Sequence, residues 1–189
     1  MFIQTEETPN PATLKFLPGK ILLDKGTLEF KSPEEATNNS LASKLFADAN
    51  VKGVFIGKDF LTVTKSESVE WEILKPTLLS SILDYFSSGG EIENYESEPK
   101  PTEEKIKYTK KDQEIVNKIN ELLEERIKPA VAQDGGDINF VKLQKGIVFL
   151  ELRGACSGCP SSTITLKSGI ENMLKYYIPE IQSVEAINQ

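Results

Sequence analysis

Two cysteines, Cys156 and Cys159, are the residues of this chain whose type and spacing could bind a metal or carry out redox chemistry. They lie in the heptapeptide GACSGCP at residues 154–160, in a chain of 189 residues that has no other cysteine and no histidine. Cysteine thiolates are soft ligands that select zinc, copper(I) or iron–sulfur clusters over magnesium or calcium. In a reducing compartment, a C-x-x-C pair is more often metal-binding or redox-active than a structural disulfide.

The sequence predicts that this pair lies on a turn between a strand and a helix. A strand-like run covers residues 147–152, and a helical pattern follows over residues 161–177. The start of a helix offers unpaired N–H groups and about half a positive charge, and both favour a thiolate over a thiol. Pro160 suits the first helical turn, where its missing N–H costs no hydrogen bond.

The number of ligands limits what the pair can hold. A cubic iron–sulfur cluster needs four thiolates, as does a zinc site made of cysteine alone, and one chain offers two. A metal therefore requires two chains that each donate a pair, or thiols from outside. Without a metal, the pair could serve a thiol–disulfide oxidoreductase, although a predicted hairpin before the motif is not the βαβ unit of thioredoxin-like proteins. A structural zinc site between subunits is the third alternative.

Residues 1–90 are predicted to form a small domain of mixed strands and helices. Short strands are expected over residues 2–7, 13–17, 27–30, 51–56 and 60–64. Ser32 and Glu35 have the spacing of a capping box, which predicts a helix that opens at this point and ends by Asn50. The apolar face of that helix is predicted to consist of Leu41, Ala42, Leu45 and Phe46.

Two further features of this domain are predicted from Gly57 and Pro76. Gly57 is expected to supply the positive φ of the turn between the last two strands. A second helix is expected to begin near Pro76, because a proline inside a helix removes one hydrogen bond. Trp71, just before it, is expected to pack on the domain core.

Residues 91–109 are interpreted as a linker, because charges alternate there without apolar periodicity and two prolines disfavour a helix. Residues 110–189 are predicted to form a second domain in the order helix, strand, strand, helix, strand. Its elements are expected at residues 110–126, 138–143, 147–152, 161–177 and 181–187. The chain is therefore predicted to be an α+β protein with two small domains and a C-x-x-C turn before its last helix.

Local signals refine this second domain. Pro129 is expected to end or bend the first helix. Ile138 and Leu143 have opposite parity along one strand, which predicts a bulge or burial on both faces. Asp134 and Asp137 flank two glycines and are expected to shape a turn there, in preference to acid–base chemistry.

Composition excludes several classes of function. The net charge of −7 and the pI near 4.9 argue against a nucleic-acid partner. No segment approaches the roughly 18 apolar residues of a membrane span, and the first residues lack the features of a signal or transit peptide, so we expect a soluble chain with no membrane partner. Without histidine, the standard hydrolase triads are excluded, and we expect that the protein is not an enzyme.

A resemblance makes the expectation specific. The DGGD turn at residues 134–137 followed by GACSGCP resembles the NifU C-terminal domain of Nfu-type iron–sulfur carrier proteins, and the opening FIQTEETPNPATLKFLPG is similar to the accessory domain before it. The resemblance implies a homodimer in which Cys156 and Cys159 of both subunits share one [4Fe–4S] cluster. It also implies transfer from a donor scaffold to recipient apoproteins, in the bacterial cytoplasm, or in the mitochondrial matrix if the chain is a processed eukaryotic one. Arg153 and Lys167 are expected to offset part of the cluster's negative charge.

Overall fold

The computed structural model describes residues 2–92, 108–157 and 160–187, with the backbone alone described for residues 160–163. It divides into two compact units, Met1–Glu96 and Ser97–Gln189. Both units combine helices with a sheet, so the predicted α+β class with two domains is confirmed.

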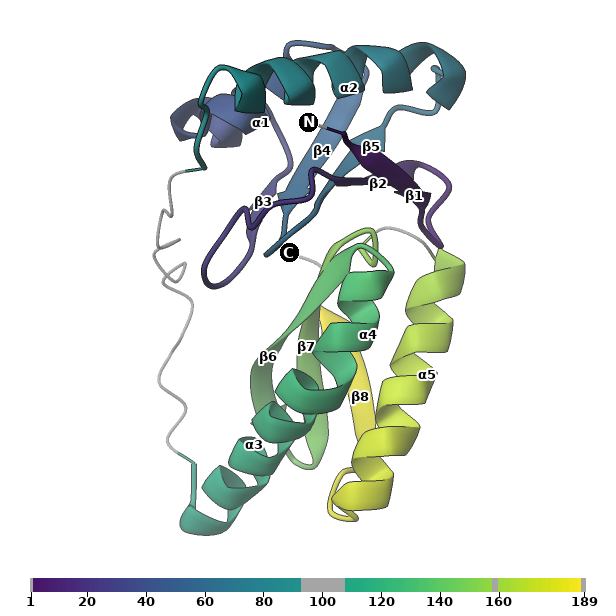
Figure 1. Cartoon of the computed structure of the whole chain (residues 1–189). Coiled ribbons are helices and arrows are strands. Elements are labelled where there is room, and N and C mark those ends of the chain that lie inside the picture. The colour runs from purple at the N-terminus through teal and green to yellow at the C-terminus, as the bar shows by residue number, and fades with distance from the viewer. Residues whose placement is uncertain (1, 93–107, 158–159, 188–189) are drawn as a thin grey trace. The chain divides into compact units, whose positions relative to one another are not determined.

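The first unit is an antiparallel sheet with two helices packed on it (Figure 1). In the described residues the strand order is β1-β2-β5-β4-β3. The strands are β1 (Gln4–Glu7), β2 (Thr13–Leu17), β3 (Leu28–Phe30), β4 (Val51–Ile56) and β5 (Leu61–Lys65). The helices are α1 (Ser40–Phe46) and α2 (Trp71–Ser87), and a 3-10 turn, Glu35–Asn38, precedes α1.

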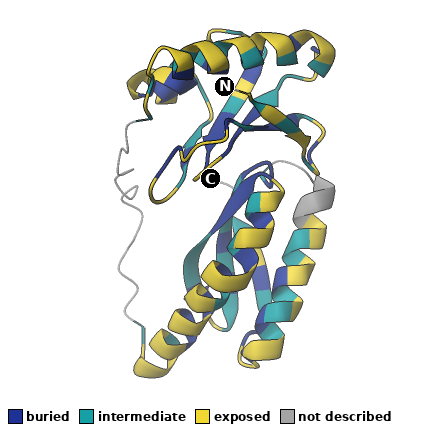
Figure 2. Cartoon of the chain, viewed as in Figure 1, coloured by how far each residue is buried: buried dark blue, intermediate teal, exposed yellow. Residues whose placement is uncertain are grey.

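The core of this unit lies between the helices and the sheet (Figure 2). Among its fully buried side chains are Phe16, Leu41, Leu45, Ile56, Leu61, Leu78 and Ile82. The apolar face predicted for α1 is buried in full, which confirms that prediction. Each such side chain contributes roughly 1.5–3 kcal/mol to folding when it leaves water.

The predicted start of α1 was wrong. Asn39, with φ −121° and ψ 109°, separates the 3-10 turn from the helix, and its Oδ1 accepts a hydrogen bond from the N–H of Ala42 at 2.9 Å. Ser32 accepts a long bond from the N–H of Glu35 at 3.4 Å, but the Glu35 carboxylate accepts from the N–H of Lys31. The reciprocal half of a capping box is therefore not made, and Asn39 is the cap.

The start of α2 also differs from the prediction, because the helix begins at Trp71 and includes Pro76. Pro76 removes one hydrogen bond from the helix. This loss is offset at the helix start, where Nε1 of Trp71 donates to the carbonyl of Pro11 at 2.9 Å and Leu74 is buried. Trp71 packs against the core, as expected. Gly57 does not have a positive φ; a Cβ there would lie 2.6 Å from the ring of Phe60, so a close approach explains this glycine.

The second unit is a sheet of order β6-β7-β8 in its described part, with its helices on one face. Its elements are α3 (Lys110–Leu122), α4 (Lys128–Gln133), β6 (Gly136–Gln144), β7 (Ile147–Gly154), α5 (Pro160–Tyr177) and β8 (Ser183–Ile187). β6 and β7 form an antiparallel hairpin, and α5 connects β7 to the parallel strand β8. Val148, Leu150 and Leu152 alternate with half-buried residues along β7, because one face of the sheet carries the core.

Pro129 does not end the first helical segment of this unit. A π-helical turn, Leu123–Ile127, lies directly before α4, and the N–H of Lys128 donates to the carbonyl of Leu123, five residues back. This wider turn comes just before Pro129, which has no N–H to donate, and helical structure continues to Gln133. Of the predicted end or bend at Pro129, the end is wrong, and the helix is instead irregular in the turn before the proline.

Of the two alternatives predicted for the first strand of the hairpin, a bulge or burial on both faces, the structure has the bulge. Phe140 pairs with Leu150 and Lys142 pairs with Phe149, so Val141 is the extra residue. The bulge reverses the parity of the strand, and both Ile138 before it and Leu143 after it are buried in the same core.

The predicted linker lies mostly outside the described residues, which resume at residue 108. Tyr108 packs on the second core, and its hydroxyl oxygen accepts a hydrogen bond from the N–H of Leu143 at 3.0 Å. Thr109 caps α3 by accepting from the N–H of Asp112 at 3.2 Å. At the other end, Ile92 packs against the first core.

Candidate functional site

The two cysteines belong to the connection between β7 and α5. β7 ends at Gly154 and α5 begins at Pro160, so the strand and helix predicted on either side of the motif are present. Cys156 is described by the structure, whereas Cys159 lies outside the described residues. Because α5 starts at the residue after Cys159, the pair lies at the N-terminal end of an 18-residue helix, where the helix dipole favours negative charge.

Backbone hydrogen bonds hold the cysteine turn against the DGGD segment. The N–H of Ala155 donates to the carbonyl of Gly135 at 3.1 Å. Both the N–H and the hydroxyl of Ser157 donate to the carbonyl of Gly154, at 3.1 and 2.9 Å. Gly135 and Gly154 have φ values of 80° and 64°, a conformation that residues with a side chain rarely adopt. Two segments about twenty residues apart in sequence therefore set the position of the cysteines together.

Cys156 is buried, with 5% of its surface exposed, and its side chain belongs to the core of the second unit. A Cβ added to Gly136 would lie 2.6 Å from the Cys156 sulfur and 2.6 Å from the carbonyl oxygen of Arg153. Gly136 is therefore required for this close approach. The sequence interpretation assigned the two glycines to a turn and missed this contact, although Gly135 alone supplies the positive φ.

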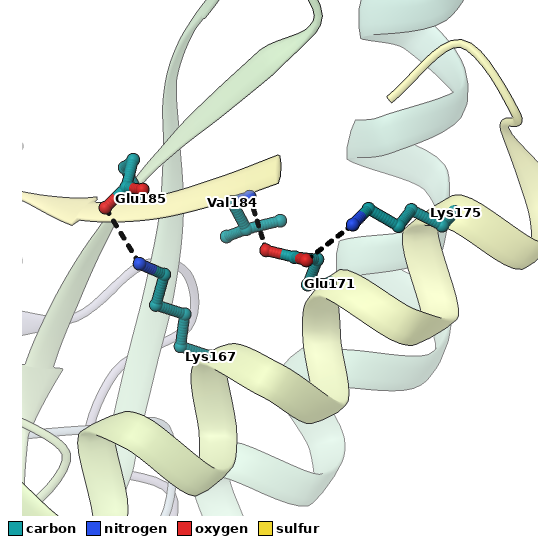
Figure 3. Close-up of polar contacts among 5 residues, drawn as sticks. All are labelled: Lys167, Glu171, Lys175, Val184 and Glu185. Carbon is teal, nitrogen blue, oxygen red and sulfur yellow. Dashed lines mark hydrogen bonds and ion pairs between the residues drawn. The ribbon is translucent and has the colours of Figure 1, made fainter. Parts of the chain in front are cut away.

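The charged residues expected beside the cysteines form ion pairs with carboxylates. Arg153 binds Glu151 through Nε at 2.9 Å and through its terminal guanidinium nitrogen at 2.8 Å. Lys167 on α5 binds Glu185 on β8 at 2.8 Å (Figure 3). Each cation is thus part of a neutral pair, which reduces the positive charge that it can offer to a cluster.

A second polar group ties α5 to the edge of the sheet. The Glu171 carboxylate accepts from Lys175 at 2.6 Å and from the N–H of Val184 at 3.0 Å (Figure 3). The hydrogen bond from Lys175 and then that from the Val184 amide lower the pKa of Glu171 below its usual value. This carboxylate therefore caps the edge strand β8 with its charge kept.

The other acids singled out from the sequence differ in their surroundings. Asp134 is exposed, whereas Asp137 is 9% exposed and lies opposite Arg153 in the β6–β7 ladder. Within residues 2–92, 108–157 and 160–187, no three histidine, cysteine or carboxylate side chains are grouped so that they could hold a metal ion.

The helices give no sign of a membrane span. None of the described helices has both the length and the apolar character that crossing a bilayer requires.

Comparison with known families identifies both halves of the chain. Residues 3–89 match the family described as "Scaffold protein Nfu/NifU N terminal", and residues 119–185 match the "NifU-like domain". The chain belongs to the Nfu/NifU scaffold-protein family. Both predicted resemblances, to the C-terminal domain and to the accessory domain, are thereby confirmed.

Similar proteins match over almost the whole chain. The human protein named "NFU1 iron-sulfur cluster scaffold homolog, mitochondrial" is 47% identical over 188 residues, which cover 99% of this chain and 72% of that protein. The protein of the same name from Drosophila sechellia is also 47% identical, with 99% of this chain and 65% of that protein covered. The chain thus spans about two thirds to three quarters of the length of these relatives.

Solved structures of smaller proteins match parts of the chain. A solution structure of a NifU-like protein from Saccharomyces cerevisiae is 28% identical, with a TM-score of 0.45, and covers 50% of this chain and 86% of its own. A crystal structure of a protein from Staphylococcus aureus is 22% identical, with a TM-score of 0.39, and covers 43% of this chain and 99% of its own.

Proposed function

We propose that this chain is an iron–sulfur cluster scaffold and carrier, in which Cys156 and Cys159 of two subunits hold one [4Fe–4S] cluster for transfer to apoproteins. The observation that carries the proposal is the pair of thiols at the start of α5 in a member of the Nfu/NifU family. The names of the relatives, iron–sulfur cluster scaffold homologues, support the choice of cargo.

Ligand number supports the homodimer. The chain has two cysteines and no histidine, so four thiolates require two chains or outside thiols. A [4Fe–4S] cluster bound by four thiolates carries about two negative charges, and two helix starts facing it supply partial positive charge from both sides. This arrangement does not depend on Arg153 or Lys167, whose charges are already paired.

Shared ligands also suit delivery. Each subunit contributes only two sulfurs, so the thiols of an acceptor can replace them one at a time while the remaining sulfurs keep their bonds. Four ligands wrapped inside one chain would tend to trap the cluster. The proposed partners are therefore a donor scaffold and recipient apoproteins with available thiols, and the proposed role is binding and transfer without catalysis.

The oxidoreductase is less consistent with the structure, because the motif follows an antiparallel hairpin and not a βαβ unit. A structural zinc site between subunits uses the same number of ligands, and the metal content after reconstitution distinguishes it from the carrier.

We further propose the domain limits 1–90 and 110–189 around a linker at 91–109, with the first domain selecting or positioning partners. The reducing compartment is proposed to be the cytoplasm of a bacterium, or the mitochondrial matrix if the chain is a processed eukaryotic protein. The names of the mitochondrial relatives support the second setting.

Anaerobic reconstitution with iron, sulfide and reductant tests the proposal. The wild-type chain should become brown and contain iron, and Cys156→Ser and Cys159→Ser should each lose the iron while circular dichroism stays unchanged. Ser80→Ala, at an exposed position on α2 of the first unit, is the control and should keep wild-type iron content.

Three further readouts separate the alternatives. A zinc protein would form a colourless dimer, and an oxidoreductase would reduce insulin disulfides as a monomer. For the carrier, transfer to an acceptor with free cysteines should be faster than loss of iron to a chelator. Transfer no faster than that loss would leave a binding protein and contradict the carrier role.

A further inference from the structure

The exposed positions of α5 carry no charged residue in its described part. From Ile164 to Tyr177 every exposed residue is uncharged, although 27% of the whole chain is charged. The charged residues of this stretch, Lys167, Glu171 and Lys175, bind each other or β8 (Figure 3). These charges thus pair along the side of α5 next to β8, with the Lys167 and Lys175 side chains 33% and 39% exposed.

The first helix of the same unit shows the usual arrangement. Its exposed residues include Lys110, Lys111, Glu114, Lys118 and Glu121. A solvated helix face normally has such charges, since they keep the surface soluble. The uncharged face of α5 is therefore a property of that helix and not of the unit.

The uncharged face has a regular shape. Ile164, Ser168, Asn172 and Tyr176 follow one another at intervals of four, and we call this row the α5 ridge. Such i, i+4 rows are the ridges by which helices pack on one another. The first and last side chains are large and 67% and 80% exposed. Gly169 beside the ridge has nothing within 4 Å of an added Cβ, so the surface there is low and open.

We propose that the α5 ridge is a contact surface for a second copy of this chain, next to the shared cysteine pair. The proposal rests on the function proposed above. α5 begins at the residue after Cys159, and Ile164 lies about 6 Å along the helix axis from Pro160. Two chains that share one small cluster must bring these helix starts close together, and Ile164 is then near the partner.

The absence of charge on the described ridge favours a second copy over a different protein. In a dimer with two-fold symmetry, each side chain near the axis faces its own copy, so a charged residue would meet the same charge. Like charges in contact disfavour association strongly. A ridge of uncharged residues avoids this repulsion. A basic partner attracted by the net charge of −7 would need carboxylates to bind, and the ridge residues have none.

Charge substitutions at Ser168 test the surface. Ser168→Glu and Ser168→Lys place a charge in the middle of the ridge, at an exposed position where both introduced residue types are good helix formers. After anaerobic reconstitution with iron and sulfide, each variant alone should dimerise at least about tenfold more weakly than wild type by sedimentation. An equal mixture of the two should recover dimer, because the carboxylate introduced in one chain can then face the ammonium group introduced in the other.

Asn117→Glu and Asn117→Lys, on the exposed face of α3, are the matched controls and should dimerise as wild type does. A wild-type chain that takes up no iron would overturn this proposal together with the carrier. If the wild-type chain binds iron and dimerises, two results would overturn the ridge contact alone. One is that the Ser168 variants dimerise with the affinity of wild type, and the other is that their mixture dimerises no more tightly than each variant by itself.

Discussion

Replacing Gly136 by alanine is the sharpest test of how the cysteine turn is built. The added methyl group would lie 2.6 Å from both the Cys156 sulfur and the carbonyl oxygen of Arg153, about 1 Å closer than an optimal contact. The carbonyl belongs to the β6–β7 ladder and cannot move without breaking it. Overpacking of this kind costs about 1–3 kcal/mol, which for a unit of this size lowers the melting temperature by roughly 4–8 °C per kcal/mol.

The assay is thermal unfolding of the iron-free protein, combined with the rate at which Cys156 is alkylated. Gly136→Ala should lower the melting temperature of the second unit and speed alkylation, because the sulfur is pushed from its buried position. Gly169→Ala is the same substitution in open space within a helix and should stabilise by about 0.5–1 kcal/mol. Equal stability of the two variants, with Cys156 as protected as in wild type, would refute this explanation of the turn.

Three more predictions follow from particular contacts. Asn39→Ala should lower the unfolding free energy of the first unit by about 1 kcal/mol in urea titration, because Asn39 is the cap of α1. Ser32→Ala should lower it by clearly less, and equal losses of unfolding free energy in the two variants would contradict this assignment. Tyr108→Phe should cost about 0.5–1.5 kcal/mol through the lost bond to the Leu143 amide, and an unchanged urea midpoint would refute the bond. The lowered pKa of Glu171 means that the charged carboxylate stabilises the fold in full above the ordinary pKa of 4.5, and that this stabilisation is lost as pH falls from there through the lowered pKa. Glu171→Gln should therefore flatten that part of the pH–stability curve, and a curve with the wild-type slope would count against the contact.

Much of the fold could be predicted because its signals are local. Short apolar runs bounded by turn residues located the strands of the hairpins, and the opposite parity of Ile138 and Leu143 indicated a bulge or burial on both faces, of which the structure has the bulge. Helix boundaries were less predictable, because competing caps differ by about 1 kcal/mol and tertiary contacts decide between them. Asn39 prevailed over Ser32 in this way, and Trp71 extended α2 through a hydrogen bond to a residue sixty positions earlier.

The candidate site also combines residues that the local sequence singles out with contacts that it does not show. Cys156 and Cys159 are proposed as ligands on sequence grounds, because their type, spacing and number limit the chemistry. The role of Gly136 could not be predicted, since it depends on a sulfur twenty residues away in the chain. The pairing of Arg153 with Glu151 was missed, although residues two apart on a strand lie on the same face and could have suggested it.

Native mass spectrometry of the anaerobically reconstituted protein tests the central claim most directly. Sharing of one cluster by two half-sites predicts a single main species with the mass of two chains plus four iron and four sulfide, and its loss in Cys156→Ser. A species with the mass of one chain that holds iron by itself, or a chain that stays monomeric and iron-free, would contradict it.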